Sequence, residues 1–154
     1  MTSKIKDLPF IPATASVAIV KSIEPSGTAA TASGGKVWTT IPLNTVEGDT
    51  DLISLSSNQM TIKAGTYVIT TICHPTTTFI GATRIADSTG TTSLIAGGSN
   101  ISTGDSAGEF YINTVYTFTE ETTITYQWFS SGTSGIPSSF GVDEVFAILT
   151  FIKI

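Results

Sequence analysis

Charged residues are scarce in this chain of 154 residues, at 12% of the sequence against about 25% in an ordinary globular protein. Seven Lys and Arg against twelve Asp and Glu leave a formal net charge of -5. Binding to a phosphate backbone needs a cluster of cations, which this sequence lacks, so we expect no nucleic-acid partner. A surface so poor in charge indicates that part of it is covered by other subunits.

Cysteine and histidine are each present once. A single cysteine, Cys73, excludes an intramolecular disulfide, and we interpret it as a small apolar residue within a strand. His74 is the one available base for nucleophilic catalysis. Because successive strand residues point to opposite faces, Cys73 and His74 are poorly placed to act together. The sequence therefore predicts a protein that is not an enzyme and holds no cofactor.

Acidic residues offer few further candidates for chemistry. These are two adjacent pairs and three loop aspartates: Glu120 with Glu121, Asp143 with Glu144, and Asp49, Asp51 and Asp105. Adjacent carboxylates in a turn or at a strand start are usually solvated and do not flank a glycosidic bond. The aspartates show no ordered calcium-loop spacing. We interpret all of them as surface residues, and predict no metal site.

Long hydrophobic runs are also missing. Thr, Ser or Gly interrupts every apolar segment well before the roughly 18 residues that a membrane-spanning helix requires. The amino-terminal segment has no apolar run of the length of a signal peptide. We expect a protein made in the cytoplasm, without membrane insertion.

The residues that are abundant favour β-structure. Most segments are rich in Thr, Val, Ile, Tyr and Phe, and Gly, Ser, Asn, Asp and Pro separate them. No window shows a helical period, so we predict an all-β sandwich or barrel of short strands. The expected strands are Ser16–Lys21, Lys36–Leu43, Gln59–Ile62, Thr66–His74, Thr78–Ala86, Thr92–Ala96, Phe110–Thr119, Thr122–Phe129 and Val145–Ile154.

The clearest alternation lies in Phe110–Thr119. Phe110, Ile112 and Phe118 share one face of this strand, which we expect to be the core face. The pattern resumes in Thr122–Phe129 after a short acidic turn. The two segments are therefore predicted to pair as a hairpin.

The last segment is apolar on both faces. In an antiparallel sandwich one face of a strand normally meets solvent, so such a strand must be covered by something more. A neighbouring subunit is the simplest cover, and the chain's own loops are the alternative. The candidate residues for this interface between subunits are Val145, Phe146, Ala147, Ile148, Leu149, Phe151, Ile152 and Ile154.

Residues 1–15 read as an extended arm, because the two prolines within it prevent a helix and weaken strand pairing. We expect residues 16–154 to form a single domain, large enough for one core. The candidate anchor consists of the apolar residues and prolines of the arm: Ile5, Leu8, Pro9, Phe10, Ile11 and Pro12.

Four stretches resemble a known family: Gly34–Val46, Leu55–Ile62, Ala64–Tyr67 and Ser138–Ile154. Their order and spacing are similar to those of the carboxy-terminal jelly-roll domains of tailed-phage fibres, whose fold resembles the globular heads of complement and tumour-necrosis-factor proteins. The likeness runs from about Ser16 to the last residue. It implies an antiparallel jelly roll of about ten strands, a homotrimer, a virion location and no catalysis.

Two functions follow from the resemblance and the arm. The first is a virion structural subunit, such as a capsid decoration, collar or short fibre, in which the arm binds other virion proteins. The second is a host-attachment module whose Thr- and Ser-rich loops at 99–108 and 130–138 bind a cell-surface glycan or protein. We favour the first, since a jelly roll tolerates either use and the arm suits attachment.

Overall fold

The computed structural model describes residues 15–28, 37–73, 80–101, 109–130 and 141–154. Within them the chain forms eleven strands. The strands are β1 (Val17–Glu24), β2 (Trp38–Thr40), β3 (Thr45–Gly48), β4 (Ile53–Ser56), β5 (Gln59–Ile62), β6 (Gly65–Cys73), β7 (Ile80–Asp87), β8 (Ser93–Ile101), β9 (Phe110–Phe118), β10 (Thr122–Ser130) and β11 (Glu144–Lys153). The described part contains no helix that is long and apolar enough to cross a membrane.

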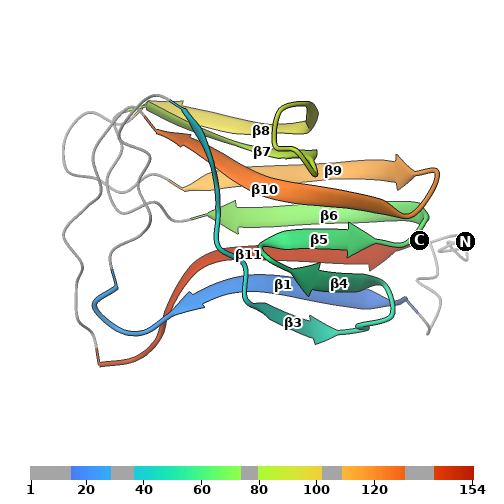
Figure 1. Cartoon of the computed structure of the whole chain (residues 1–154), viewed down its shortest axis with the longest axis horizontal. Coiled ribbons are helices and arrows are strands. Elements are labelled where there is room, and N and C mark those ends of the chain that lie inside the picture. Colours follow the sequence, from blue (N-terminus) through green and yellow to red (C-terminus); the bar gives the residue numbers. More distant parts are fainter. Residues whose placement is uncertain (1–14, 29–36, 74–79, 102–108, 131–140) are drawn as a thin grey trace, which may run out of the picture.

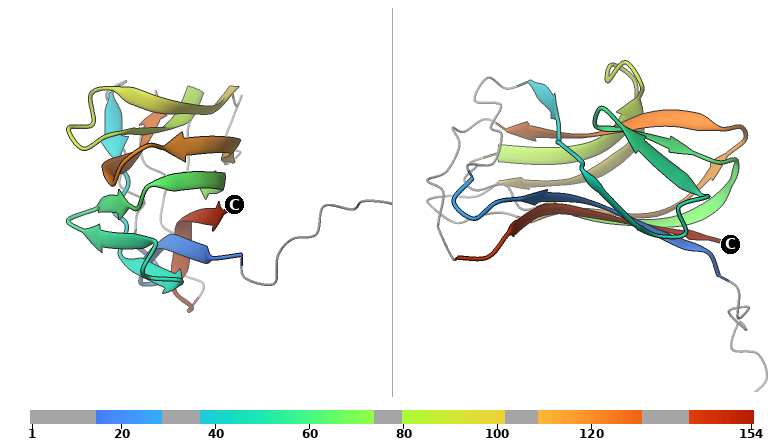
Figure 2. Two further views of the ribbon diagram at one scale, coloured as in Figure 1. Left: turned by 90° about the vertical axis from the view of Figure 1, so that its right-hand side faces the viewer. Right: turned by 60° about the horizontal axis from the view of Figure 1, so that its bottom comes forward.

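The strands make two sheets that pack face to face (Figures 1 and 2). One sheet has the order β3-β1-β11-β6-β9, and the other has the order β4-β5-β10-β7-β8, with β2 pairing to β10 beside β5. All of the pairings are antiparallel. The prediction of an all-β antiparallel jelly-roll sandwich is confirmed.

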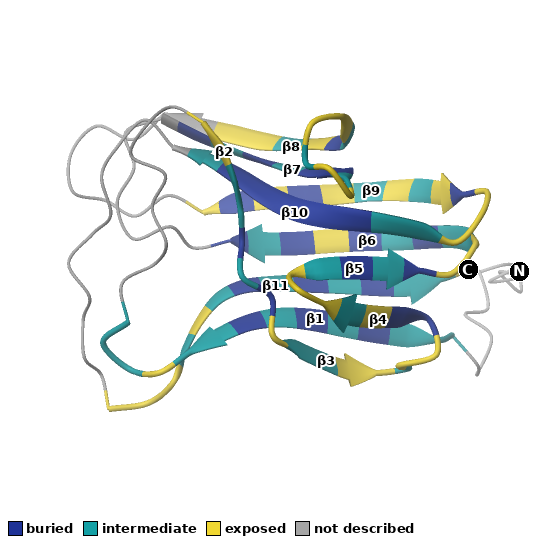
Figure 3. Ribbon diagram, viewed as in Figure 1, coloured by how far each residue is buried: buried dark blue, intermediate teal, exposed yellow. Residues whose placement is uncertain are grey.

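The core lies between the two sheets. It is filled by the side chains that point inward from the strands of both sheets. Along β1, β5, β6 and β11, buried residues alternate with residues that are mostly of intermediate burial, as Figure 3 shows. The largest side chains that are less than 2% exposed are Tyr67, Tyr126, Phe110, Phe151, Ile53, Met60, Ile62, Ile69, Ile85, Ile124, Leu149 and Val20. Tyr67 enters this core directly after the turn at Ala64 and Gly65, as the sequence indicated.

A few polar groups are buried with partners inside the core. The Tyr126 hydroxyl lies 3.0 Å from Thr71 Oγ1, and Thr71 Oγ1 accepts a hydrogen bond from the Ile112 backbone N–H. Burial raises the pKa of the Cys73 thiol to about 12, and it also raises the pKa of Tyr126 above its ordinary value. Cys73 is therefore a protonated core residue, in agreement with the interpretation from sequence.

The predicted hairpin of β9 and β10 is wrong. β9 pairs with β6 in the five-stranded sheet, whereas β10 pairs with β5, β2 and β7 in the six-stranded sheet. The turn between them therefore crosses from one sheet to the other. Alternation identifies a strand and its inner face, but it carries no information about which strand lies alongside.

Two strands were missed between Leu43 and Gln59. β3 pairs with β1, although its end at Gly48 reads as a turn in the sequence. β4 and β5 form a hairpin around Ser57 and Asn58, which both adopt positive φ, at 50° and 65°. The expected strand Lys36–Leu43 is shorter than predicted, and is limited among described residues to β2.

Candidate functional site

The outer face of the five-stranded sheet is the feature that the chain's own fold leaves uncovered. Because side chains alternate, the residues next to the buried positions of β1, β11, β6 and β9 point away from the core. The strand register aligns them in three rows across the sheet: Val17, Ile152, Val68 and Val115; Ile19, Thr150, Thr70 and Asn113; Lys21, Ile148, Ile72 and Tyr111.

These rows are mainly apolar. Eight of their twelve side chains are aliphatic or aromatic, and none of the twelve is buried. Val115 and Tyr111 on β9 are 58% and 47% exposed. An antiparallel sheet with one solvated face normally places polar residues there. This face instead has the character of a surface that becomes buried on association.

The middle row forms the floor of a hollow of about 320 Å³. Its residues Thr150, Thr70 and Asn113 are short and polar, whereas the longer Ile148, Ile72 and Tyr111 rise beside them. The lining is completed by Thr71 and Ile112. The hollow therefore offers hydroxyl and amide groups at its floor and apolar side chains at its edge. This lining suits an apolar side chain that ends in a polar group.

Charge is confined to the margin of this face. Lys21 is the one charged residue in the three rows, and its Nζ lies 2.6 Å from Glu47 Oε2 on the neighbouring strand β3. At the other margin, the Tyr111 hydroxyl donates to Glu109, and this hydrogen bond raises the pKa of Tyr111. The centre of the face therefore carries no charge that association would have to desolvate.

The predicted trimer-interface residues divide between the two sides of β11. Ala147, Leu149 and Phe151 are 0% exposed and face the protomer's own core, so the prediction that their side chains contact a partner is corrected. The strand's position inside a sandwich buries this face without another subunit. The remaining members lie outward or at the strand ends: Val145, Phe146, Ile148, Ile152 and Ile154. Their role as an interface stays a prediction.

Several other predicted positions fall outside the described residues. All of the candidate anchor residues do so, as do His74 and Asp105 and most of the two hydroxyl-rich loops. Among the described carboxylates, Glu144 accepts a hydrogen bond from the Gly27 backbone at 3.0 Å, and Asp49 accepts one from the Asp51 backbone at 3.1 Å. No group of three or more His, Cys, Asp or Glu in the described part could hold a metal ion.

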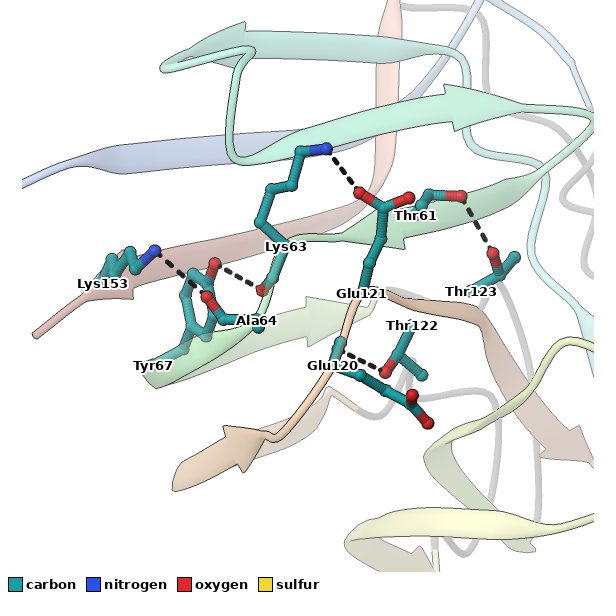
Figure 4. Close-up of polar contacts among 9 residues, drawn as sticks. All are labelled: Thr61, Lys63, Ala64, Tyr67, Glu120, Glu121, Thr122, Thr123 and Lys153. Carbon is teal, nitrogen blue, oxygen red and sulfur yellow. Dashed lines mark hydrogen bonds and ion pairs between the residues drawn. The ribbon is translucent and has the colours of Figure 1, made fainter.

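A second hollow, of about 230 Å³, lies near one end of the sandwich. It is lined by Thr50, Asp51, Leu52, Ser54, Thr61, Lys63 and Glu121. Glu121 and Lys63 lie across from each other with Oε2 and Nζ 2.5 Å apart (Figure 4), and this contact raises the pKa of Lys63. Both side chains are more than half exposed. The pair neutralises itself in solvent, and Asp51 is the remaining charged residue of this lining.

Sequence reasoning found the outward residues of β11 but missed those of β6 and β9. Ile72 and Val68 lie within an apolar run of strand β6, and Tyr111 and Val115 lie on the face of β9 opposite the predicted core face. The register that brings all four beside Ile148 and Ile152 is set by tertiary pairing. The available signal was the presence of two apolar residues, four positions apart, on the face of β9 opposite the core.

No protein-family model matches the chain, and no curated protein matches it. Solved structures do. A crystal structure of murine APRIL at pH 8.5 superposes with a TM-score of 0.60 at 14% identity, covering 92% of this chain and 100% of that chain. The globular domain of a zebrafish complement 1qA protein superposes with a TM-score of 0.58 at 11% identity, covering 92% of this chain and 98% of that chain.

These comparisons define the class of fold. The chain is a jelly roll of the kind found in tumour-necrosis-factor-like proteins and complement globular heads. At 11–14% identity the likeness concerns the fold alone. The fold is compatible with a non-enzymatic structural or binding role, which has to be argued from the surface.

Proposed function

We propose that this chain is a self-associating virion subunit of a tailed phage, in which three copies pack the outer faces of their five-stranded sheets around a threefold axis. The observation that carries the self-association is the apolar outer face itself. Its three rows extend over four strands and have one charged residue, which is already paired at the margin. Burying such a face against identical faces removes apolar area from water at little desolvation cost.

The resemblance to phage-fibre jelly rolls supports a ring of three over a twofold pair. The outward residues of β11 lie near the middle of the face, between β1 and β6. The exposed Tyr111 and Val115 lie at its β9 edge. A contact between the edge of one copy and the middle of the next is heterologous, and it closes into a ring when the rotation between copies is 120°.

The virion role rests on the sequence resemblance and on the arm of residues 1–15. Two prolines and several apolar side chains there suit an extended segment that docks in another protein. The arm attaches the ring to the capsid, collar or tail, after synthesis in the host cytoplasm.

Oligomeric mass and a matched pair of substitutions test the self-association. The native protein should have three times the 16.1 kDa mass of the chain in light scattering after size exclusion. Val115→Asp places a charge on the outer face and should yield a folded monomer. Val142→Asp introduces the same change at a residue that is 65% exposed and lies outside the three rows, so it should leave the trimer intact.

The proposed interface is wrong if the native protein is a monomer at micromolar concentration, or if the Val115→Asp protein remains a trimer. A native dimer would overturn the threefold arrangement. Circular dichroism shows whether each variant has kept its β-structure.

Removal of residues 1–12 tests the virion role separately. The shortened protein should still form the trimer but should no longer be incorporated into particles. Unchanged incorporation would count against the arm as the anchor.

A further inference from the structure

Arg84 occupies an unusual position on the outer face of the six-stranded sheet, opposite the candidate interface. It belongs to β7, and its side chain crosses the neighbouring strand β10 to reach β2, where its guanidinium carbon lies 4.3 Å from the centre of the Trp38 ring. Trp38 also packs against Phe129, with ring centroids 5.6 Å apart. Three strands therefore meet in one cluster of a cation and two aromatic rings.

The guanidinium is held rigidly in this cluster. Arg84 Nε donates to Gln127 Oε1 at 2.8 Å, and a terminal nitrogen donates to the Gly90 carbonyl at 2.8 Å. Gln127 is 4% exposed, so its amide is a fixed acceptor. Gly90 has φ +72°, and a Cβ there would lie 2.5 Å from Gln127 Nε2, so glycine is required for this approach. The planar group is thereby oriented before any ligand arrives.

The charge of Arg84 is uncompensated within the described residues. Lys21 and Lys63 each have a carboxylate partner, whereas among the described residues no carboxylate pairs with Arg84 or with Lys153, which donates to the Ala64 carbonyl instead. Arg84 is also the single arginine in a chain of net charge -5. Its two hydrogen bonds use two of the five N–H donors of a guanidinium, and no described residue accepts from the other three. Those donors, on a planar fork, match the geometry of a carboxylate or phosphate.

Small residues lie across the register from two members of the cluster: Ala96 on β8 from Arg84, and Ala82 on β7 from Phe129. Trp38 is 36% exposed although it is a large aromatic residue. An exposed indole offers a flat apolar surface on which the C–H face of a sugar ring packs with loss of water from both.

We propose that Arg84 and Trp38 form a binding site for an anionic saccharide, in which the guanidinium takes the carboxylate or phosphate and the indole takes the sugar ring. Gln127 and Gly90 position the guanidinium and do not touch the ligand. The site lies on the opposite sheet from the candidate assembly face, so it does not depend on the proposed function. A sugar carboxylate and a sugar phosphate share the same anion chemistry, and the experiment separates them.

Nuclear magnetic resonance offers a direct test. Because the chain contains one arginine, its Nε–H gives a unique signal that needs no assignment, and the indole signal of Trp38 is distinguished from that of Trp128 by Trp38→Phe. Both signals should move and saturate together on titration with D-glucuronate or with glucose 6-phosphate. The tighter of the two ligands identifies the preferred anion. D-Glucose should bind at least about tenfold more weakly, since it lacks the charged hydrogen-bond acceptor.

Substitutions show whether the contacts are specific. Arg84→Lys keeps the charge but loses the planar fork, and it should weaken binding about tenfold or more. Lys63→Gln removes a positive charge elsewhere on the surface and should leave the affinity unchanged. The proposal is overturned if Arg84→Lys binds as the native protein does, if neither anionic sugar moves the two signals, or if inorganic phosphate binds as tightly as glucose 6-phosphate, which would leave no role for the indole.

Discussion

The two faces of β11 can be distinguished by substituting neighbouring residues, Leu149→Ala and Ile148→Ala. Leu149 is 0% exposed within the protomer, whereas Ile148 is half-buried and points outward beside Ile72. The core face should determine whether the protomer folds, and the outer face should determine whether protomers associate. One residue of separation along the strand therefore changes which equilibrium is affected.

The magnitudes follow from burial. Leu149→Ala removes fully buried carbon and leaves a cavity, for which about 3 kcal/mol of unfolding free energy is expected. Ile148→Ala removes three carbon atoms that are half-buried, which costs the protomer about 1 kcal/mol at about 0.8 kcal/mol per fully buried CH₂. Association buries the other half of the surface of these carbon atoms in each of the three copies, so the substitution weakens the trimer three times over. That loss of about 3 kcal/mol per trimer weakens assembly on the order of a hundredfold.

Urea unfolding and sedimentation equilibrium measure the two effects. With a urea dependence of about 2 kcal/mol per molar, Leu149→Ala should lower the unfolding midpoint by about 1.5 M and leave the folded protein trimeric. Ile148→Ala should lower it by about 1 M, because each chain loses about 1 kcal/mol of folding and about 1 kcal/mol of association free energy, and it should dissociate at protein concentrations where the native trimer persists. In the native protein, raising the concentration about a hundredfold should raise the midpoint by about 0.9 M, because unfolding releases three chains.

Either of two results would refute this reasoning. A Leu149→Ala protein as stable as the native one would show that this side chain does not fill the core. An Ile148→Ala protein that assembles like the native one would show that the outer side of β11 makes no contact between copies.

Three further predictions concern the protomer. Gly81→Ala should lower the free energy of unfolding by about 1–3 kcal/mol through overpacking, because its Cβ would lie 2.2 Å from the Phe110 ring. In Gly98→Ala the new Cβ would lie 3.4 Å from its nearest neighbour, so the melting temperature should stay close to native. Cys73 should resist thiol reagents in the folded state, because its raised pKa disfavours the thiolate there. The free energy of unfolding should therefore be constant below pH 9 and fall between about pH 9 and about 12, where only the unfolded chain ionises. The fall should be shallower in Cys73→Ala. Hydrogen bonds, chiefly from Thr89, lower the pKa of Asp87 to about 2, so its carboxyl signal should titrate near pH 2. The stability that Asp87 gives to the β7–β8 turn should be present above the ordinary pKa of 3.8 and lost as the pH falls toward 2.

Local patterns predicted the strands well but not their partners. Alternation in β9 correctly placed Phe110, Ile112 and Phe118 in the core. The pairing of β9 with β6 depends on contacts between residues that are far apart in the sequence, such as Cys73 with Phe110 and Gly65 with Phe118. A short turn between two alternating segments was therefore read as a hairpin although it connects two sheets.

The two proposed surfaces were predictable to different degrees. The two-sided apolar character of β11 is visible in the sequence, but its inner and outer sides could be told apart only through the packing of Leu149 and Phe151. The cluster of Arg84 and Trp38 had no sequence signal. These residues lie 46 positions apart in the sequence, and they meet because β10 has β7 on one side and β2 on the other.

The two proposed surfaces lie on opposite sheets, and this arrangement links assembly to binding. If three copies bury their five-stranded sheets around one axis, each Arg84 faces away from the axis and remains accessible. Three weak sites on one particle then bind a surface rich in the ligand more strongly than one site does. Val115→Asp should keep the Arg84 signal shift with soluble glucuronate but release faster from a glucuronate-coated surface. Equal release from that surface by monomer and trimer would show that the three sites do not engage together.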